Sequence, residues 1–139
     1  MNKPIITILS FLFISITMMS QPKDMKYRVI QSDEVVTISY GTSIAHTRSG
    51  YHVVWVKADY SDPEWQRYFA LMADINTPVY TTLTKVWYDS IYSFVMVRQV
   101  LLYSKNGKLL YDTGEDSSAG WQYVNASDPV GIVGEYLGE

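Results

Sequence analysis

The feature that most constrains the fold is a series of short runs rich in Val, Ile, Thr, Tyr and Trp, with turn-forming residues between them. β-Branched and aromatic residues pack well on the partly buried surface of a sheet, so runs of this kind predict strands. No repeat or linker interrupts residues 24–139, which favours one mainly antiparallel β domain. The predicted strands cover residues 27–31, 35–40, 42–47, 51–57, 79–88, 91–103, 109–111 and 121–124.

Two of the turns predict hairpins. Arg48-Ser49-Gly50 separates residues 42–47 from residues 51–57. Asn106-Gly107 lies between two lysines, and this dipeptide adopts positive φ angles at small steric cost, as a tight hairpin turn requires. We therefore expect residues 109–111 to pair with residues 100–102.

Two helix-start patterns interrupt the strands. In Ser61-Asp62-Pro63-Glu64, a capping side chain precedes a proline and an acidic residue, which predicts a short helix ending near Asp74. Its apolar residues follow the spacing i, i+3, i+4, i+7 and are expected to pack on the sheet; they are Trp65, Tyr68, Phe69 and Met72. Ser127-Asp128-Pro129 opens a second short helix, which Gly131 and Gly134 are expected to weaken.

The N-terminal segment has the pattern of a signal peptide. Lys3 supplies a positive start, and residues 5–19 form an apolar run that is shorter than the roughly 20 residues of a membrane-spanning helix. We predict a signal peptide over residues 1–20 and a single exported domain over residues 21–139, in the periplasm, at the cell surface or secreted. After cleavage no stable membrane insertion is expected, and an uncleaved N-terminal anchor is the alternative.

Composition supports one folded domain and excludes several functions. The chain has 139 residues, of which 47% are hydrophobic and 18% charged, so it can build a core. Without Lys3, ten basic residues remain against 14 acidic ones, and the basic residues are scattered, which argues against nucleic acid as a partner. The lack of cysteine excludes disulfides, thiol catalysis, cysteine-based zinc sites and a lipid-modified cysteine.

Several short sequence features follow one another in a characteristic order. They are Tyr40, Ser43-Ile44, Gly50, residues 54–57 (Val-Trp-Val-Lys), Asp89, Tyr103 before Asn106-Gly107-Lys108, and Trp121 before Ser127-Asp128-Pro129. In this order the chain resembles the surface-adhesin protein E-like family of exported bacterial domains over about residues 27–137. Ser90 stands where such proteins often have cysteine, and residues 62–76 form a longer insertion.

The resemblance implies an α+β fold that is mainly antiparallel β. It implies a single curved sheet of about six strands, like a half barrel, with one or two short packed helices. Members of the namesake group are adhesins that bind host matrix and plasma proteins, so a protein or glycan at the cell surface is the expected kind of partner.

His46 and His52 are the only histidines. A hairpin that turns at residues 48–50 would place them opposite each other, with Cβ atoms roughly 5 Å apart, close enough to share a metal or a haem or to form a pH-dependent contact. Two ligands are fewer than the four of a usual zinc site, so two solvated strand histidines are the alternative. We predict no cofactor beyond this candidate pair.

Aromatic residues are the candidate binding residues. The chain has 12 Tyr and four Trp, a type enriched at interfaces but also used in small cores. The candidates are Trp55, Tyr88, Tyr92, Tyr103 and Trp121, of which the three tyrosines are expected to form an exposed patch.

No catalytic motif is present, since no Gly-x-Ser-x-Gly elbow occurs and carboxylates such as Asp112, Glu115 and Asp116 lie in a loop-like stretch. We therefore predict a non-enzymatic cell-envelope binding protein, adhesin-like, that recognises a protein or glycan through an aromatic sheet face. A periplasmic carrier of a small hydrophobic ligand and an enzyme of unrecognised type are the alternatives. An exposed aromatic patch would favour the first, a lined cavity beneath the first helix the second, and a buried cluster of ionisable groups the third.

Overall fold

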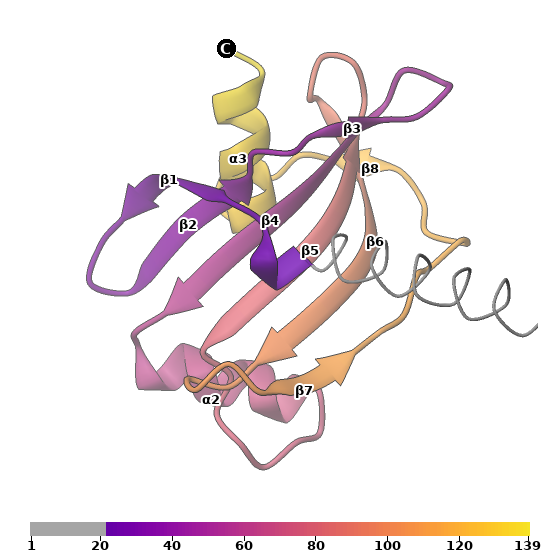
Figure 1. Ribbon diagram of the computed structural model, residues 1–139. Coiled ribbons are helices and arrows are strands. Elements are labelled where there is room, and N and C mark those ends of the chain that lie inside the picture. The colour runs from indigo at the N-terminus through magenta and orange to yellow at the C-terminus, as the bar shows by residue number, and fades with distance from the viewer. Residues whose placement is uncertain (1–21) are drawn as a thin grey trace, which may run out of the picture.

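A computed structural model of the protein describes residues 22–139, so the predicted signal peptide lies outside the described residues. These residues form eight strands, two α-helices and one short 3-10 helix (Figure 1). The elements are η1 (Pro22–Asp24), β1 (Tyr27–Ser32), β2 (Val36–Gly41), β3 (Ala45–His46), β4 (His52–Tyr60), α2 (Pro63–Met72), β5 (Thr81–Tyr88), β6 (Phe94–Tyr103), β7 (Leu109–Asp112), β8 (Gln122–Tyr123) and α3 (Pro129–Leu137).

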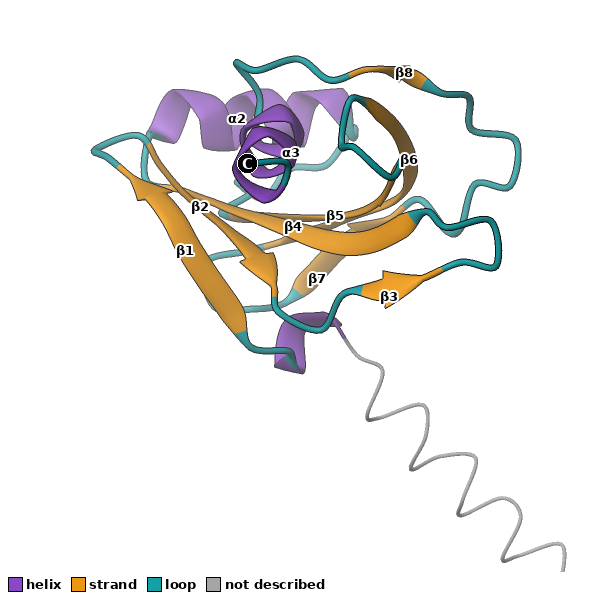
Figure 2. Ribbon diagram, turned by 90° about the horizontal axis from the view of Figure 1, so that it is seen from above, coloured by secondary structure: helices purple, strands orange, loops and turns teal. Residues whose placement is uncertain are grey.

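The strands form one antiparallel sheet. Its main order is β1-β2-β4-β5-β6-β7, while the two-residue strands β3 and β8 pair with β4 and β6. The sheet curves, and α2 and α3 lie on the same face of it (Figure 2). The predicted α+β fold with a single curved antiparallel sheet and two short helices is therefore confirmed. Within the described part of the chain, no helix is long and apolar enough to cross a membrane.

Both faces of the sheet are partly buried. On the face that carries the helices, alternate residues of the central strands form the main core with Val133 of α3; they are Ile38, Tyr40, Val54, Val56, Val86, Tyr88 and Val95. On the opposite face, Leu83, Leu101 and Tyr103 form a smaller cluster with Tyr27 and Trp55. A strand that is largely buried on both faces has no solvent face, so period-two alternation does not indicate which side faces water.

The hairpin at Asn106-Gly107 forms, with a modified turn. Gly107 has a φ of 85°, and the Gly107 N–H donates to the Ser104 carbonyl at 3.0 Å. Asn106 does not have a positive φ, so the turn is closed by a single left-handed glycine. Strand β7 pairs with residues 101–103, one position later than expected.

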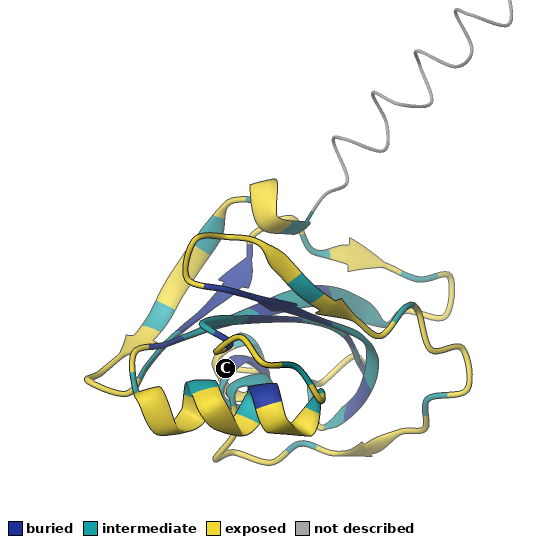
Figure 3. Ribbon diagram, turned by 90° about the horizontal axis from the view of Figure 1, so that it is seen from below, coloured by how far each residue is buried: buried dark blue, intermediate teal, exposed yellow. Residues whose placement is uncertain are grey.

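The predicted inner face of α2 is wrong for two of its four residues. Tyr68 and Met72 are exposed at 48% and 71%, whereas Phe69 packs against the core. Trp65 is 44% exposed, but its ring lies 6.1 Å from that of Tyr60 in β4. Periodicity showed that the helix is apolar on one side, but the apolar residues are too many for one buried face, so spacing alone did not select the buried side. Most of the outer surface of α2 is exposed in Figure 3.

Phe69 and two alanines make the contact of α2 with the core. Ala70 is buried, and Ala73 and Phe69 pack beside it against Val79 and Leu102. The helix begins after Asp62, whose carboxylate accepts the Glu64 N–H at 3.0 Å. This is the predicted cap, and it fixes the start of the helix.

The two glycines of α3 are required by close packing. A Cβ at Gly131 would lie 1.5 Å from the Asn125 carbonyl oxygen, and a Cβ at Gly134 would lie 2.9 Å from the Tyr88 ring. Glycine generally lowers the intrinsic stability of a helix, but here it lets the helix touch the sheet and the preceding loop.

We expect Gly131→Ala to destabilise the protein by about 2 kcal/mol or more, although alanine is the better helix former, because the new methyl group has no space. Gly120→Ala is the matched control, since a methyl group added there would have no neighbouring atom within 4 Å and the φ of Gly120 is not positive. Thermal unfolding of both variants measures the difference. A Gly131→Ala protein as stable as the Gly120→Ala protein would contradict this packing.

Candidate functional site

A groove lies between α2 and α3 on the helix-bearing face of the sheet. Its volume is about 890 Å³, within the range of roughly 300–1,000 Å³ that is usual for small-molecule sites. The floor comes from β2, β4, β5 and β6, one wall from α2, and the other wall from α3 and the segment that precedes it. The groove exists because each helix covers only one end of the curved sheet, α3 the upper end and α2 the lower end in Figure 1.

The interior of the groove is apolar. The lining includes aliphatic residues from the strands and from α3, and aromatic residues from α2 and the neighbouring strands. They are Val35, Val36, Ile38, Val56, Tyr60, Trp65, Phe69, Val95, Val97, Val100, Leu102, Tyr123, Val130 and Ile132. Two threonines of β5, Thr82 and Thr84, also line it.

Apart from Pro129, the remaining lining residues are polar and gather at two places. Gln31 and Asp33 lie at the end of β1 and in the turn to β2, and Gln122, Asn125, Ser127 and Asp128 lie in β8 and the segment leading into α3. Asp33 and Asp128 are exposed, so they lie at the mouth of the groove. An apolar interior with a few polar groups at its mouth is the usual arrangement of a site for a small organic ligand.

Both aspartates are held by the local backbone. Asp33 Oδ1 accepts the Val35 and Val36 N–H groups at 2.8 and 2.9 Å, and these bonds lower the pKa of Asp33. Asp128 Oδ1 accepts the Gly131 N–H at 2.8 Å and caps α3. Burial raises the pKa of Tyr60 to about 12, and the Asp128 charge adds to the effect, so this carboxylate acts on a residue of the groove wall.

The expected exposed patch of Tyr88, Tyr92 and Tyr103 does not form. Tyr88 is 0% exposed and Tyr103 only 8%, because they belong to cores on opposite faces of the sheet. Tyr92 is half-buried and packs on Tyr88, with ring centroids 5.2 Å apart. Tyr88 and Tyr103 are therefore structural residues, and this part of the site prediction is wrong.

The tryptophan candidates lie elsewhere. Trp55 is half-buried against Leu83 and Tyr103 on the face away from the helices. Trp121 is exposed and meets the Tyr51 ring edge-on at 4.8 Å. The five aromatic candidates thus do not share one surface.

His46 and His52 do come together. They are directly opposite in the β3–β4 ladder, with ring centroids 4.8 Å apart, and His52 also stacks on Tyr92 at 4.6 Å. The buried Nδ1 atom of His52 has no hydrogen-bond partner among the described residues. Residues 22–139 contain no group of three or more His, Cys, Asp or Glu side chains placed to hold a metal. The shared metal or haem stays a prediction.

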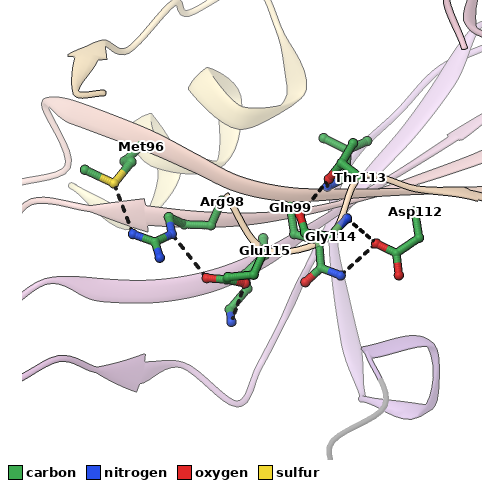
Figure 4. A network of polar contacts seen from close by, with 9 residues as sticks. Met96, Arg98, Gln99, Asp112, Thr113, Gly114 and Glu115 are labelled. Carbon is green, nitrogen blue, oxygen red and sulfur yellow. Dashed lines mark hydrogen bonds and ion pairs between the residues drawn. The ribbon is translucent and has the colours of Figure 1, made fainter. Parts of the chain in front are cut away.

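The carboxylates of residues 112–116 hold their segment on the sheet (Figure 4). Glu115 bonds Lys85 Nζ and Arg98 Nε, each at 3.1 Å. Asp112 accepts the Gly114 N–H at 2.8 Å and the Gln99 side-chain amide at 2.9 Å. Arg98 also lies 4.2 Å above the Trp87 ring. These contacts give the acidic loop a structural role.

Comparisons with known proteins leave the family open: no family model, curated protein or solved structure matches this chain. The resemblance to the surface-adhesin protein E-like family stays a prediction based on the residues quoted above.

The groove residues were not identified from the sequence as site residues. They come from segments far apart along the chain, so no local motif contains them. Two signals were available: the apolar face of α2, whose Trp65 and Phe69 line the groove, and the aspartates Asp33 and Asp128, each followed by apolar lining residues.

Tyr88 should contribute to stability in a pH-dependent way. Its hydroxyl donates to the Val130 carbonyl at 2.7 Å, and burial raises its pKa far above the ordinary value. Tyr88→Phe should lower the free energy of unfolding by about 1 kcal/mol at neutral pH. Above pH ~10 the unfolded tyrosine loses its proton while the folded one keeps it, so wild-type stability falls by up to about 1.4 kcal/mol per pH unit for this group.

Denaturant unfolding between neutral and strongly alkaline pH measures both effects. The Tyr88→Phe protein should lose stability less steeply above pH ~10, because it lacks this proton loss. Tyr111→Phe, at an exposed tyrosine of β7, is the control and should follow the wild type. Equal slopes for the wild type and Tyr88→Phe would contradict the argument.

The histidine pair has a direct test. If both imidazoles share a metal, the His46→Ala/His52→Ala protein should bind Zn²⁺ more weakly than the wild type in calorimetric titration, because each nitrogen is one ligand. Identical weak binding by the two proteins would exclude the pair as a metal site.

Proposed function

We propose that the protein is an exported, non-enzymatic binding protein that holds a small, mainly apolar ligand in the groove between α2 and α3. The observation that carries the proposal is the groove itself, with its volume of about 890 Å³ and its lining of aliphatic and aromatic side chains. Export is inferred from the apolar segment that precedes the domain.

The driving force would be burial of apolar surface. Val97 and Val100 line the groove and remain half-buried, so part of their surface contacts water. Covering apolar surface is favourable by about 25 cal/mol per Å². A ligand that fills the groove would cover lining residues from both helices and from the sheet at once, which favours an occupant with an extended or bulky apolar body.

The groove supports a small ligand better than the aromatic candidates support a protein or glycan. Recognition through a sheet face needs several exposed aromatic residues on one surface. Tyr88 and Tyr103 are buried, and Trp55 is half-buried among core residues. Trp121 alone of the five candidates is exposed, so these five residues do not supply such a surface.

N-Phenyl-1-naphthylamine, an uncharged fluorescent probe of apolar sites, tests the proposal. We expect saturable binding to the purified domain. Thr84→Trp should weaken this binding at least tenfold, because Thr84 lies on the groove floor and an indole there would occupy the space of the ligand. Fluorescence titration measures the change in affinity.

Gln99→Trp is the matched control. Gln99 belongs to β6, and its side chain bonds Asp112 on the face away from the helices, so the added indole stays outside the groove. This variant should bind the probe as the wild type does. Absence of saturable binding by the wild type, or equal loss in both variants, would refute a ligand site in the groove.

A further inference from the structure

The charges at the mouth of the groove identify the class of head group that its ligand carries. Resting on the proposed function, we propose that the groove selects amphiphiles with a cationic head group, and that the carboxylates of Asp33 and Asp128 contact this head group while the apolar body lies between α2 and α3.

The charged residues that line the groove are all acidic. Among the residues that line the groove in the described part of the chain, none is Lys, Arg or His, whereas Asp33 and Asp128 both belong to the lining. An anionic head group would therefore meet two like charges and no opposite one. A cationic head group would meet two opposite charges.

Both mouth carboxylates can contact a ligand, because neither forms a salt bridge within residues 22–139. The salt bridges among residues 22–139 involve Asp59 and Glu115, so neither mouth carboxylate is paired with a cation of the described chain. The backbone N–H groups bond Oδ1 of Asp33 and Oδ1 of Asp128, which positions each carboxylate while its negative charge stays at the mouth. Both carboxylates are exposed, so their interactions with a ligand would be weakened by salt.

The N-terminus of α3 also lies at the mouth of the groove. The positive end of a helix dipole generally favours anions. Here Asp128 already occupies that position as the cap, Pro129 has no N–H, and the Gly131 N–H is bonded to Asp128. The feature that would attract an anion is thus taken by the protein's own carboxylate.

Apolar lining residues next to each aspartate provide a place for the apolar body of the ligand. Asp33 is followed by Val35 and Val36, and Asp128 is followed by Val130, and these three valines line the groove. Each carboxylate is therefore close in sequence to apolar lining, so one ligand has a place for its charge and a place for its chain. Tyr60 also lines the groove, so the apolar lining continues from the valines to the aromatic residues of β4 and α2.

The experiment compares three ligands with the same ten-carbon chain and different head groups. Decylammonium, decanol and decanoate compete with N-phenyl-1-naphthylamine for the wild-type protein at neutral pH, below their micelle-forming concentrations. We expect decylammonium to bind about fivefold more tightly than decanol, and decanoate to bind more weakly than decanol. Added salt should weaken decylammonium and leave decanol unchanged.

Substitutions that remove charge but keep the backbone bonds test the role of the two aspartates. Asn accepts the same N–H bonds and is a good helix cap, so Asp33→Asn/Asp128→Asn should keep its fold. In this variant decylammonium and decanol should bind with nearly equal affinity. Asp116→Asn is the matched control, because Asp116 is held in the same way by the Ser118 N–H at 2.9 Å but does not line the groove.

The outcomes separate this inference from the proposed function. If decanoate binds as tightly as decylammonium, or if the preference survives in Asp33→Asn/Asp128→Asn, the cationic head group is wrong while the apolar groove stands. If none of the three ligands displaces the probe, the inference fails, and probe binding by Thr84→Trp and Gln99→Trp decides the proposed function separately. If the double variant does not fold, the salt dependence of the wild type decides: equal salt dependence for decylammonium and decanol overturns the inference.

Discussion

The close approach of α3 to the sheet is the contact on which the rest of the structure depends. Tyr88 is completely buried beneath this helix and donates a hydrogen bond to the Val130 carbonyl. The ring reaches this position because Gly134 has no side chain to displace it. A single buried tyrosine therefore joins the central strand β5 to the C-terminal helix and determines how far α3 extends over the sheet.

The groove follows from this placement. α3 packs over β2, β4 and β5, whereas α2 contacts mainly the end of β4, so the floor between them is left open. The curvature of the sheet brings β6 round to close the far side, as Figure 2 shows. From α2 only Trp65 and Phe69 reach the groove, while Ala70 is buried against the sheet. The site is thus the unfilled part of the core.

The fold could be predicted from the sequence to the extent that its signals are local. Strand composition, the caps Asp62 and Asp128, and the Asn-Gly turn each act over a few residues, and the elements they predicted form. The burial of Tyr88 and Tyr103 could not be predicted. Both faces of the central strands are apolar, and period-two alternation then does not indicate which face contacts solvent. The prediction of the buried face of α2 failed for a related reason, because the helix carries more aromatic residues than one face can bury.

The same distinction between local and long-range signals explains why the histidine pair was predicted residue by residue, whereas the groove was predicted only as an alternative and without most of its lining residues. His46 and His52 face each other across one hairpin, and a turn of known position determines that register. The groove requires β2, β6 and α3 to be placed relative to one another, which depends on the whole sheet order. Asp128 illustrates both cases. The following Pro129 predicts that Asp128 caps a helix, whereas the position of Asp128 at the mouth of the groove depends on how α3 packs on the sheet. Because the same carboxylate caps α3 and lines the mouth, a ligand that binds there would also stabilise the folded state by mass action, and ligand binding and the docking of α3 are thermodynamically coupled.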